Sequence, residues 1–270
     1  MMKLKIFICC ILFSFSLSTM AQTKLSFKYG CSDAVLETTQ VSVFIESSNN
    51  KMELLNNDTI RKFEEKMNIP AEKTDYTLFV EFENTTIGKE TLIYPFALDG
   101  NETDIEIKVA FYKTEIYDKK KRENARIDIV KYYESNLDIE IQYLPEMKGD
   151  EFCKAPFFRL KNNSKDTIYG QHLSSYFWGS ISFLIDTIWS RNYFGILDYE
   201  FGCGSPLFPN SEKIAWVGSF GWRNDLPKLH YKYTLLYKTR KNNLKQEKKN
   251  FVWRAGTESY YRLVYEFDVE

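Results

Sequence analysis

Hydrophobic and polar residues alternate with a period of two along much of this chain. Such alternation gives a β-strand one buried face and one wet face, and it is typical of antiparallel sheets. The alternating segments are residues 76–82, 105–111, 137–143, 229–237 and 261–269, and two further strands are expected at 24–30 and 38–46. The abundance of aromatic residues, with 18 Tyr and 21 Phe, also favours strands. The pattern therefore predicts a mostly β protein.

One segment departs from this period. Asp58 can cap a helix in which Ile60, Phe63 and Met67 lie on one face at helical spacing, and Pro70 ends it. We therefore expect one short helix in the first half of the chain, covering one face of a sheet.

The distribution of charge predicts two domains. Residues 22–150 carry 25 acidic and 17 basic side chains, whereas residues 151–270 carry 12 acidic and 17 basic ones. Pro145 and Gly149 interrupt the alternation between the two halves. We expect an acidic β domain at 22–148 and a second domain at 153–270.

The second of these domains has the spacing of an immunoglobulin-like sandwich, with about seven short strands separated by turn residues. The cysteine and tryptophan pattern of true immunoglobulin domains is missing, so the sequence indicates the architecture and no family. The expected fold is thus two antiparallel β-sandwich-like domains, the second immunoglobulin-like, with the short helix in the first.

The first 21 residues have the pattern of a secretory signal peptide. Lys3 and Lys5 precede an apolar run at 6–17, and the small residues Thr19 and Ala21 precede the expected cut. The run is shorter than the roughly 20 apolar residues of a spanning helix, and no later segment is apolar enough to span a membrane. The pattern predicts export to the periplasm or to the outside of the cell, followed by cleavage after Ala21.

Three cysteines follow that cut, at Cys31, Cys153 and Cys203. In an exported protein an odd number favours one disulfide and one remaining thiol. Cys153 precedes the strands of the second half, and Cys203 lies in the central glycine-rich loop of that half. We expect these two to form the disulfide, and three thiols are the alternative.

Residues 176–222 form the most aromatic stretch, with 13 aromatic residues that include four of the five tryptophans. Tryptophans of this kind either fill a core or stack on sugar rings and anchor protein partners. We expect at least one of Trp189 and Trp222, each of which has an arginine nearby in the sequence, to be exposed. The candidate binding residues are Trp178, Trp189, Trp222, Arg191 and Arg223.

Candidates for catalysis are few. Cys203 with His172 could form a thiol–imidazole pair, and Asp198 with Glu200 could form a carboxylate pair in aromatic surroundings. The i, i+2 spacing of the two acids fits the wet face of a strand equally well. The sequence contains no nucleophile elbow, phosphate-binding loop or metal-ligand cluster, so we expect no catalytic residue, no metal and no cofactor.

The second histidine of the chain, His230, lies between Lys228 and Lys232. Positive neighbours lower the pKa of an imidazole, so the sequence predicts a lowered pKa and a poor base or metal ligand.

The tripeptide Asp-Thr-Ile occurs three times, with its threonine at Thr59, Thr167 and Thr187. It resembles the Asp-Thr/Ser-apolar acceptor signature of some bacterial periplasmic O-glycosylation systems. That resemblance makes the three threonines candidate glycosylation sites. A turn aspartate followed by a β-branched strand start explains the same pattern without modification.

Two basic segments, at 118–126 and 238–250, have the composition of solvated hairpin tips or of patches for an acidic partner. The net charge of −1 argues against a general nucleic-acid-binding role.

The sequence therefore favours an exported, non-enzymatic protein that binds a protein or glycan partner, a class that includes inhibitor and immunity-type proteins. The alternative is a hydrolase that uses Cys203 and His172, or Asp198 and Glu200.

Overall fold

The computed structural model describes most of the chain beyond residue 20 as β-structure. The described segments are 21–31, 39–48, 50–58, 62–84, 88–111, 125–147, 156–170, 178–190, 206–216, 227–239, 245–248 and 252–270. Their regular structure consists of strands, which confirms the prediction of a mostly β protein. Within these segments no helix has the length and hydropathy needed to cross a membrane.

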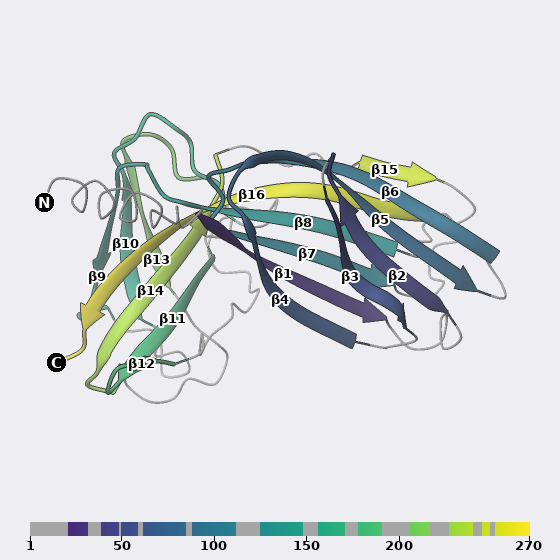
Figure 1. The fold of residues 1–270 in the computed structure, drawn as a ribbon. Helices are drawn as coiled ribbons and strands as arrows, with labels where there is room; N and C mark the ends of the chain where they lie inside the picture. The colour runs from purple at the N-terminus through teal and green to yellow at the C-terminus, as the bar shows by residue number, and fades with distance from the viewer. Residues whose placement is uncertain are drawn as a thin grey trace, which may run out of the picture.

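Sixteen strands make up the described structure (Figure 1). Those of the first half are β1 (Gln22–Cys31), β2 (Gln40–Glu46), β3 (Lys51–Asp58), β4 (Lys62–Pro70), β5 (Lys73–Asn84), β6 (Gly88–Asp99), β7 (Asp104–Phe111), β8 (Ala125–Glu134) and β9 (Ile139–Tyr143). Those of the second half are β10 (Phe157–Asn162), β11 (Trp178–Ile185), β12 (Ile188–Trp189), β13 (Ser211–Trp216), β14 (His230–Tyr237), β15 (Lys245–Lys248) and β16 (Val252–Asp268).

The predicted short helix is wrong, because residues 62–70 form β4, which pairs with β1 along its whole length. Phe63 and Met67 are spaced four residues apart, which suits one face of a helix and equally one side of a strand. Ile69 continues the strand period and is buried, and the ring of Phe63 packs against that of Phe27 in β1. A helix this short gains little stability of its own, whereas strand pairing satisfies the backbone along β4.

The strands form three sheets. The long sheet has the order β12-β11-β14-β16-β8-β7-β1-β4, with β15 paired to β16. The four-stranded sheet has the order β3-β2-β5-β6, and the three-stranded sheet the order β13-β10-β9. Two neighbouring pairs of the long sheet, β1 with β7 and β8 with β16, are parallel, so the expectation of purely antiparallel sheets is wrong there.

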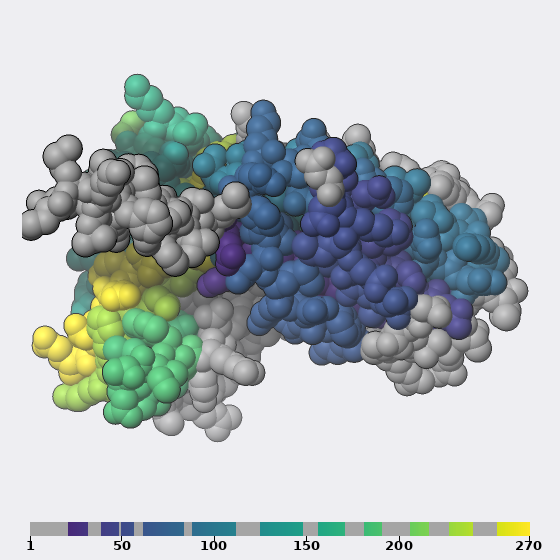
Figure 2. Space-filling model, in the orientation of Figure 1, coloured from purple at the N-terminus to yellow at the C-terminus, as the bar shows by residue number. Residues whose placement is uncertain are grey.

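The first core lies between the long sheet and the four-stranded sheet. The alternation at 76–82 and 105–111 is confirmed, because these strands bury their hydrophobic positions toward each other. Phe82 and Phe111 make an edge contact between the two sheets, with ring centroids 5.4 Å apart. In Figure 2 the blue side chains of the four-stranded sheet lie on the side of the molecule that faces the viewer.

The second core lies between the other end of the long sheet and the three-stranded sheet. Phe158 of β10 stacks on Tyr233 of β14 with centroids 4.3 Å apart. The predicted alternation at 229–237 is confirmed, because Tyr231, Tyr233, Leu235 and Tyr237 are all buried in this core.

Both cores share β16, which has 17 residues and spans about 56 Å at the usual rise of a strand. Its start contributes Trp253 and Ala255 to the first core, and its end contributes Phe267 to the second. Figure 1 shows β16 running through both parts of the long sheet. Each core thus includes residues from both sides of the predicted boundary at 148–153. The division into two domains stays a prediction.

Candidate functional site

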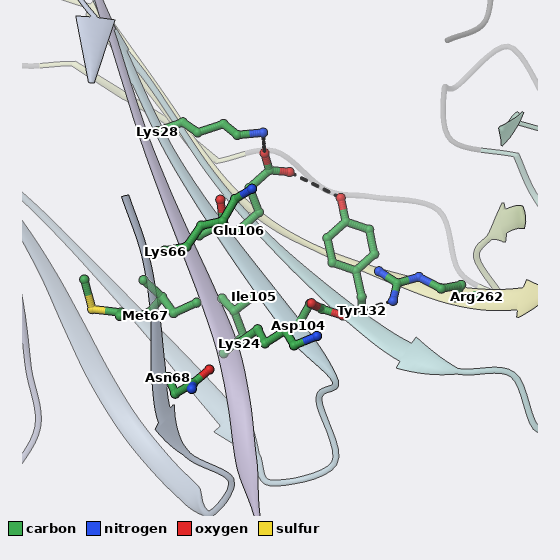
Figure 3. A pocket seen from close by; sticks show the side chains of 12 residues that line it. Lys24, Lys28, Lys66, Met67, Asn68, Asp104, Ile105, Glu106, Tyr132 and Arg262 are labelled. Atoms are coloured by element: carbon green, nitrogen blue, oxygen red, sulfur yellow. Dashed lines mark hydrogen bonds and ion pairs between the residues drawn. The ribbon is translucent and has the colours of Figure 1, made fainter. Parts of the chain in front are cut away.

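A groove lies on the outer face of the long sheet, the face that points away from the four-stranded sheet. In β1 the core takes Leu25, Phe27 and Tyr29, and the residues between them point outward. We call the hollow over β4, β1, β7, β8 and the middle of β16 the outer groove, and its volume is about 740 Å³. Its polar side chains are Lys24, Ser26, Lys28, Lys66, Asn68, Asp104, Glu106, Tyr132 and Arg262 (Figure 3).

Ser26 forms the low point of this groove. It lies opposite Lys66 on one side and Glu106 on the other, and Lys24 and Lys28 are its neighbours on the same side of β1. A small side chain among four long ones leaves a hollow between them. The Ser26 hydroxyl is shielded from solvent and has no hydrogen-bond partner in the part of the chain that the structure describes.

The Glu106 carboxylate is the centre of the polar network. Lys28 Nζ lies 2.6 Å from its Oε1, and the Tyr132 hydroxyl donates to Oε2 at 3.3 Å (Figure 3). Lys108 Nζ lies 3.0 Å from the same Oε2. Burial alone would raise the pKa of Glu106, but the hydrogen bond from Lys28 and the charge of Lys108 outweigh it and hold the pKa below its usual range. The carboxylate is therefore ionised across the neutral range.

Tyr132 and Arg262 form the adjoining wall. Burial, reinforced by the negative charge of Glu106, raises the pKa of Tyr132 well above its usual range. The Arg262 guanidinium lies over the Tyr132 ring at 5.3 Å and pairs with Asp104 at 3.0 Å. The pKa of Glu106 is thus lowered and that of Tyr132 is raised, so both lie far from pH 7. Near pH 7 the Glu106 carboxylate stays ionised and the Tyr132 hydroxyl stays protonated. The two groups can offer charge and hydrogen bonds but are poorly suited to proton transfer.

The groove carries more positive than negative side chains. Its two carboxylates are paired, Glu106 with Lys28 and Lys108, and Asp104 with Arg262. Lys24 makes no ion pair within the described segments. Lys66 has one loose pair, with the exposed Glu64 at 3.7 Å. Two lysines at the rim therefore keep their charge available for a ligand.

The network continues from the groove to the junction of the two cores. The Tyr132 ring stacks on that of Tyr260, with centroids 6.1 Å apart, and the Tyr260 hydroxyl donates to Glu258. Lys238 pairs with the same carboxylate at 3.2 Å and is only 8% exposed. Burial lowers the pKa of Lys238, although Glu258 opposes the shift.

A second polar and aromatic cluster lies at the far end of the long sheet. Trp189 is half-buried there, with Lys232 Nζ 4.2 Å from its ring centroid and the His230 ring 5.6 Å away. His230 contacts Asp268 at 2.8 Å and Glu266 at 3.2 Å across the strand pair. These two hydrogen bonds, Asp268 first, raise the pKa of His230. The predicted lowering is wrong because cross-strand acids lie closer to the imidazole than the sequence neighbours suggested.

The structure places few of the other predicted site residues. Trp178 belongs to β11, and its side chain lies outside the described part. Thr167 is half-buried beside a β-bridge, and Thr187 is exposed in the turn between β11 and β12. The remaining candidates fall outside the described residues, namely Thr59, Cys153, His172, Arg191, Asp198, Glu200, Cys203, Trp222 and Arg223.

Among the described side chains, no set of three or more His, Cys, Asp or Glu residues is arranged to hold a metal ion. No protein-family model matches this chain. No curated protein sequence matches it either.

The sequence predicted the strands that became β1, β7 and the end of β16, but it predicted a helix where β4 lies and gave no strand for β8, and it did not indicate the groove. Lys24, Ser26 and Lys28 are the polar positions of one alternating segment, and Asp104 and Glu106 those of another. Bringing them together requires β1 to pair in parallel with β7, which lies far from it in the chain. A serine between two lysines on the wet side of a strand was the one local signal of a hollow.

Proposed function

We propose that this chain is an exported, non-enzymatic protein that binds a protein or glycan partner through the outer groove. The observation that carries the proposal is the groove itself, in which paired carboxylates hold Lys28 and Arg262 in place while Lys24 and Lys66 stay available. Side chains fixed by their own contacts lose less freedom on binding, so such a surface is prepared for a ligand.

The protonation states of the groove support binding over catalysis at this site. A general acid or base works best with a pKa near the working pH, and the pKa values of Glu106 and Tyr132 move away from it. The half-buried Trp189, on the same side of the long sheet, offers a second area of contact.

Export rests on the signal-peptide pattern of residues 1–21. The immunoglobulin-like second domain and the disulfide between Cys153 and Cys203 remain predictions. Inhibitor and immunity-type proteins belong to the proposed class because they too are exported binders without catalytic groups. Trp178, Trp189, Trp222, Arg191 and Arg223 remain the proposed aromatic and basic contacts.

A hydrolase that uses Cys203 and His172, or Asp198 and Glu200, is the second candidate. Intact mass before and after thiol alkylation distinguishes it from the first. A disulfide at Cys203 removes the nucleophile, whereas rapid alkylation at neutral pH indicates the lowered thiol pKa that catalysis requires.

Capture from the native envelope fraction, together with a glycan array, tests the binding role. We expect the wild-type protein to retain a partner that Lys66→Glu loses, because the substitution reverses a charge at the rim of the groove. Lys89→Glu is the matched control, since Lys89 is an exposed lysine on β6 of the other sheet. Equal capture by all three proteins contradicts a role for the groove.

A further inference from the structure

We propose that the outer groove contains an anion subsite centred on Ser26 that binds the carboxylate or sulfate groups of an acidic glycan. This inference rests on the proposed binding function and gives its ligand a chemical class.

The hydroxyl of Ser26 is the first reason. It is shielded from solvent, and no described residue accepts or donates a hydrogen bond to it. A buried polar group without a partner is unfavourable unless something satisfies it. The hydroxyl lies beneath the long side chains that surround the hollow, so an anionic oxygen that enters the groove would accept its hydrogen bond once these side chains turn aside.

The available charges are the second reason. Lys66 lies directly opposite Ser26 in β4, and Lys24 is the next outward-facing residue of β1. On the other side of Ser26, Lys28 and Lys108 share the single negative charge of Glu106. Positive charge therefore exceeds negative charge around the hollow, and Lys24 and the loosely paired Lys66 lie on the β1 and β4 side of it, next to the hydroxyl. Ammonium groups and a hydroxyl arranged around one point are donors that suit a carboxylate or a sulfate.

The remaining lining favours a sugar over a protein segment. The centres of protein interfaces are depleted in Lys, Glu, Asp and Ser, which are the residues of this groove. The Tyr132 ring, the aromatic part of the lining, has Arg262 over one face, so recognition in this groove would depend on its polar groups. Asn68 lies opposite Lys24 and carries both a donor and an acceptor for sugar hydroxyls.

The size of the groove agrees with this ligand. A volume of about 740 Å³ is far larger than one carboxylate or sulfate ion and falls within the range of sites for small organic molecules. The anionic group would occupy the hollow at Ser26, and the rest of the sugar residue would extend over Asn68 and Asp104.

The test measures binding of the full mature chain to four polymers by calorimetry, at low and at physiological salt. The probes are polygalacturonate for carboxylates, heparin for sulfates, dextran as a neutral glycan and polyglutamate as an acidic peptide. We expect binding to at least one acidic glycan, weakening with salt, and at least tenfold weaker binding to dextran and polyglutamate.

Three variants connect that binding to the hollow. Lys24→Gln with Lys66→Gln removes the available charges at exposed positions, and we expect about a tenfold or larger loss. Ser26→Leu fills the hollow and keeps every charge, and it should cause a similar loss with an unchanged melting temperature. Lys89→Gln, the control, should bind within about twofold of wild type.

The outcomes separate this inference from the proposed function. Equal affinity for dextran, preference for polyglutamate, or unchanged binding by the double lysine variant overturns the anion subsite. If Lys66→Glu still abolishes capture of an envelope partner in that case, the binding function stands and only its ligand class is wrong. If neither the envelope capture nor the polymer binding depends on groove residues, both proposals fail.

Discussion

The two cores of this protein are built from different side chains. The first core consists mainly of aliphatic residues, with Val43, Leu78 and Ile107 fully buried between the sheets. The second core has a larger share of rings, five of its eleven described buried residues against seven of twenty-five in the first. In it Phe158 contacts Tyr233 face to face and Phe267 edge-on. Both attach to the same long sheet, so the difference lies in the side chains and not in the backbone that carries them.

The difference matters because every buried tyrosine brings a hydroxyl that needs a partner. The Tyr231 hydroxyl donates to the Pro227 carbonyl at 2.8 Å, and that of Tyr237 is bonded to Ser135. The Tyr233 hydroxyl has no partner among the residues that the structure describes. The second core therefore depends on positioned hydrogen bonds as well as on packing, because three of its five buried rings are tyrosines, against two of seven in the first core.

The largest effect is expected from Phe158→Ala. Phe158 is fully buried and contacts the rings of Tyr143, Tyr233 and Phe267, so its removal leaves a cavity and should lower the free energy of unfolding by about 4 kcal/mol. Urea denaturation followed by circular dichroism measures it. Phe44→Ala is the control, because Phe44 stacks on Phe79 at a half-buried position and should lose only about 1 kcal/mol. Equal losses in the free energy of unfolding would show that the buried ring of Phe158 contributes no more to stability than the half-buried ring of Phe44.

Lys238→Ala tests the buried ion pair between the two cores. It leaves Glu258 in a largely buried site without its cation, and we expect a loss of about 3 kcal/mol in the free energy of unfolding. The double variant Lys238→Met with Glu258→Leu removes both charges and should lose less than about 1 kcal/mol. The same denaturation experiment compares them, and a double variant less stable than Lys238→Ala would contradict the interpretation.

Removing the hydroxyl of a buried tyrosine should have different effects on stability, depending on whether that hydroxyl has a hydrogen-bond partner. Tyr237→Phe should lower the free energy of unfolding by about 1 kcal/mol, because it leaves Ser135 without its partner. Tyr233→Phe should change it by less than about 0.5 kcal/mol or stabilise the protein, since burial of that hydroxyl is not compensated within the described structure. Thermal melts of the two variants beside wild type decide the matter, and a larger loss for Tyr233→Phe would indicate a partner for its hydroxyl.

The smallest effects on stability are expected from changes of pH. Glu106 should make the protein less stable as the pH falls, and His230 should make it less stable as the pH rises. The folded pKa of Glu106 lies below 4.5, so its contribution to stability is present above that pH and is lost as the pH falls through the folded pKa. The folded pKa of His230 lies above 6.5, so its contribution is present below 6.5 and is lost as the pH rises through the folded pKa.

Denaturation midpoints between pH 3 and pH 9 test both expectations. Glu106→Gln should flatten the acid limb of the stability profile, and His230→Gln should flatten its neutral to alkaline limb. Trp189 reports on His230 separately, because a charged imidazole 5.6 Å from the indole is expected to quench its fluorescence. An unchanged alkaline limb in His230→Gln would rule out the raised pKa.

The sequence predicted the strands well because their signal is local. Alternation at 105–111 and 229–237 needs only neighbours in the chain to be recognised, and the structure buries those positions. Errors arose where distant partners decide the outcome. Residues 62–70 form a strand because β1 pairs with them, and His230 has a raised pKa because β16 places Asp268 and Glu266 beside it.

The outer groove was missed for the same reason. Its polar residues come from five strands, and two of the pairings that assemble them are parallel and connect distant parts of the chain. Alternation marks Lys24, Ser26 and Lys28 as outward-facing but does not reveal which strands flank them. Only the order β4-β1-β7-β8-β16 places Lys66, Glu106 and Arg262 around one hollow.

Because β16 contributes to both cores, both are completed together. Ala125 in β8 pairs with Trp253 and His230 in β14 with Asp268, so neither core is complete before β16 has been synthesised. The pairing of β8 with β16 is distant in sequence and is expected to form slowly, because the intervening chain must first be brought together. A nascent chain that lacks β16 exposes the hydrophobic faces of two incomplete sheets at once. We expect the two cores to acquire their native packing in one late step, with equal refolding rates whether the aromatic or the aliphatic core is monitored.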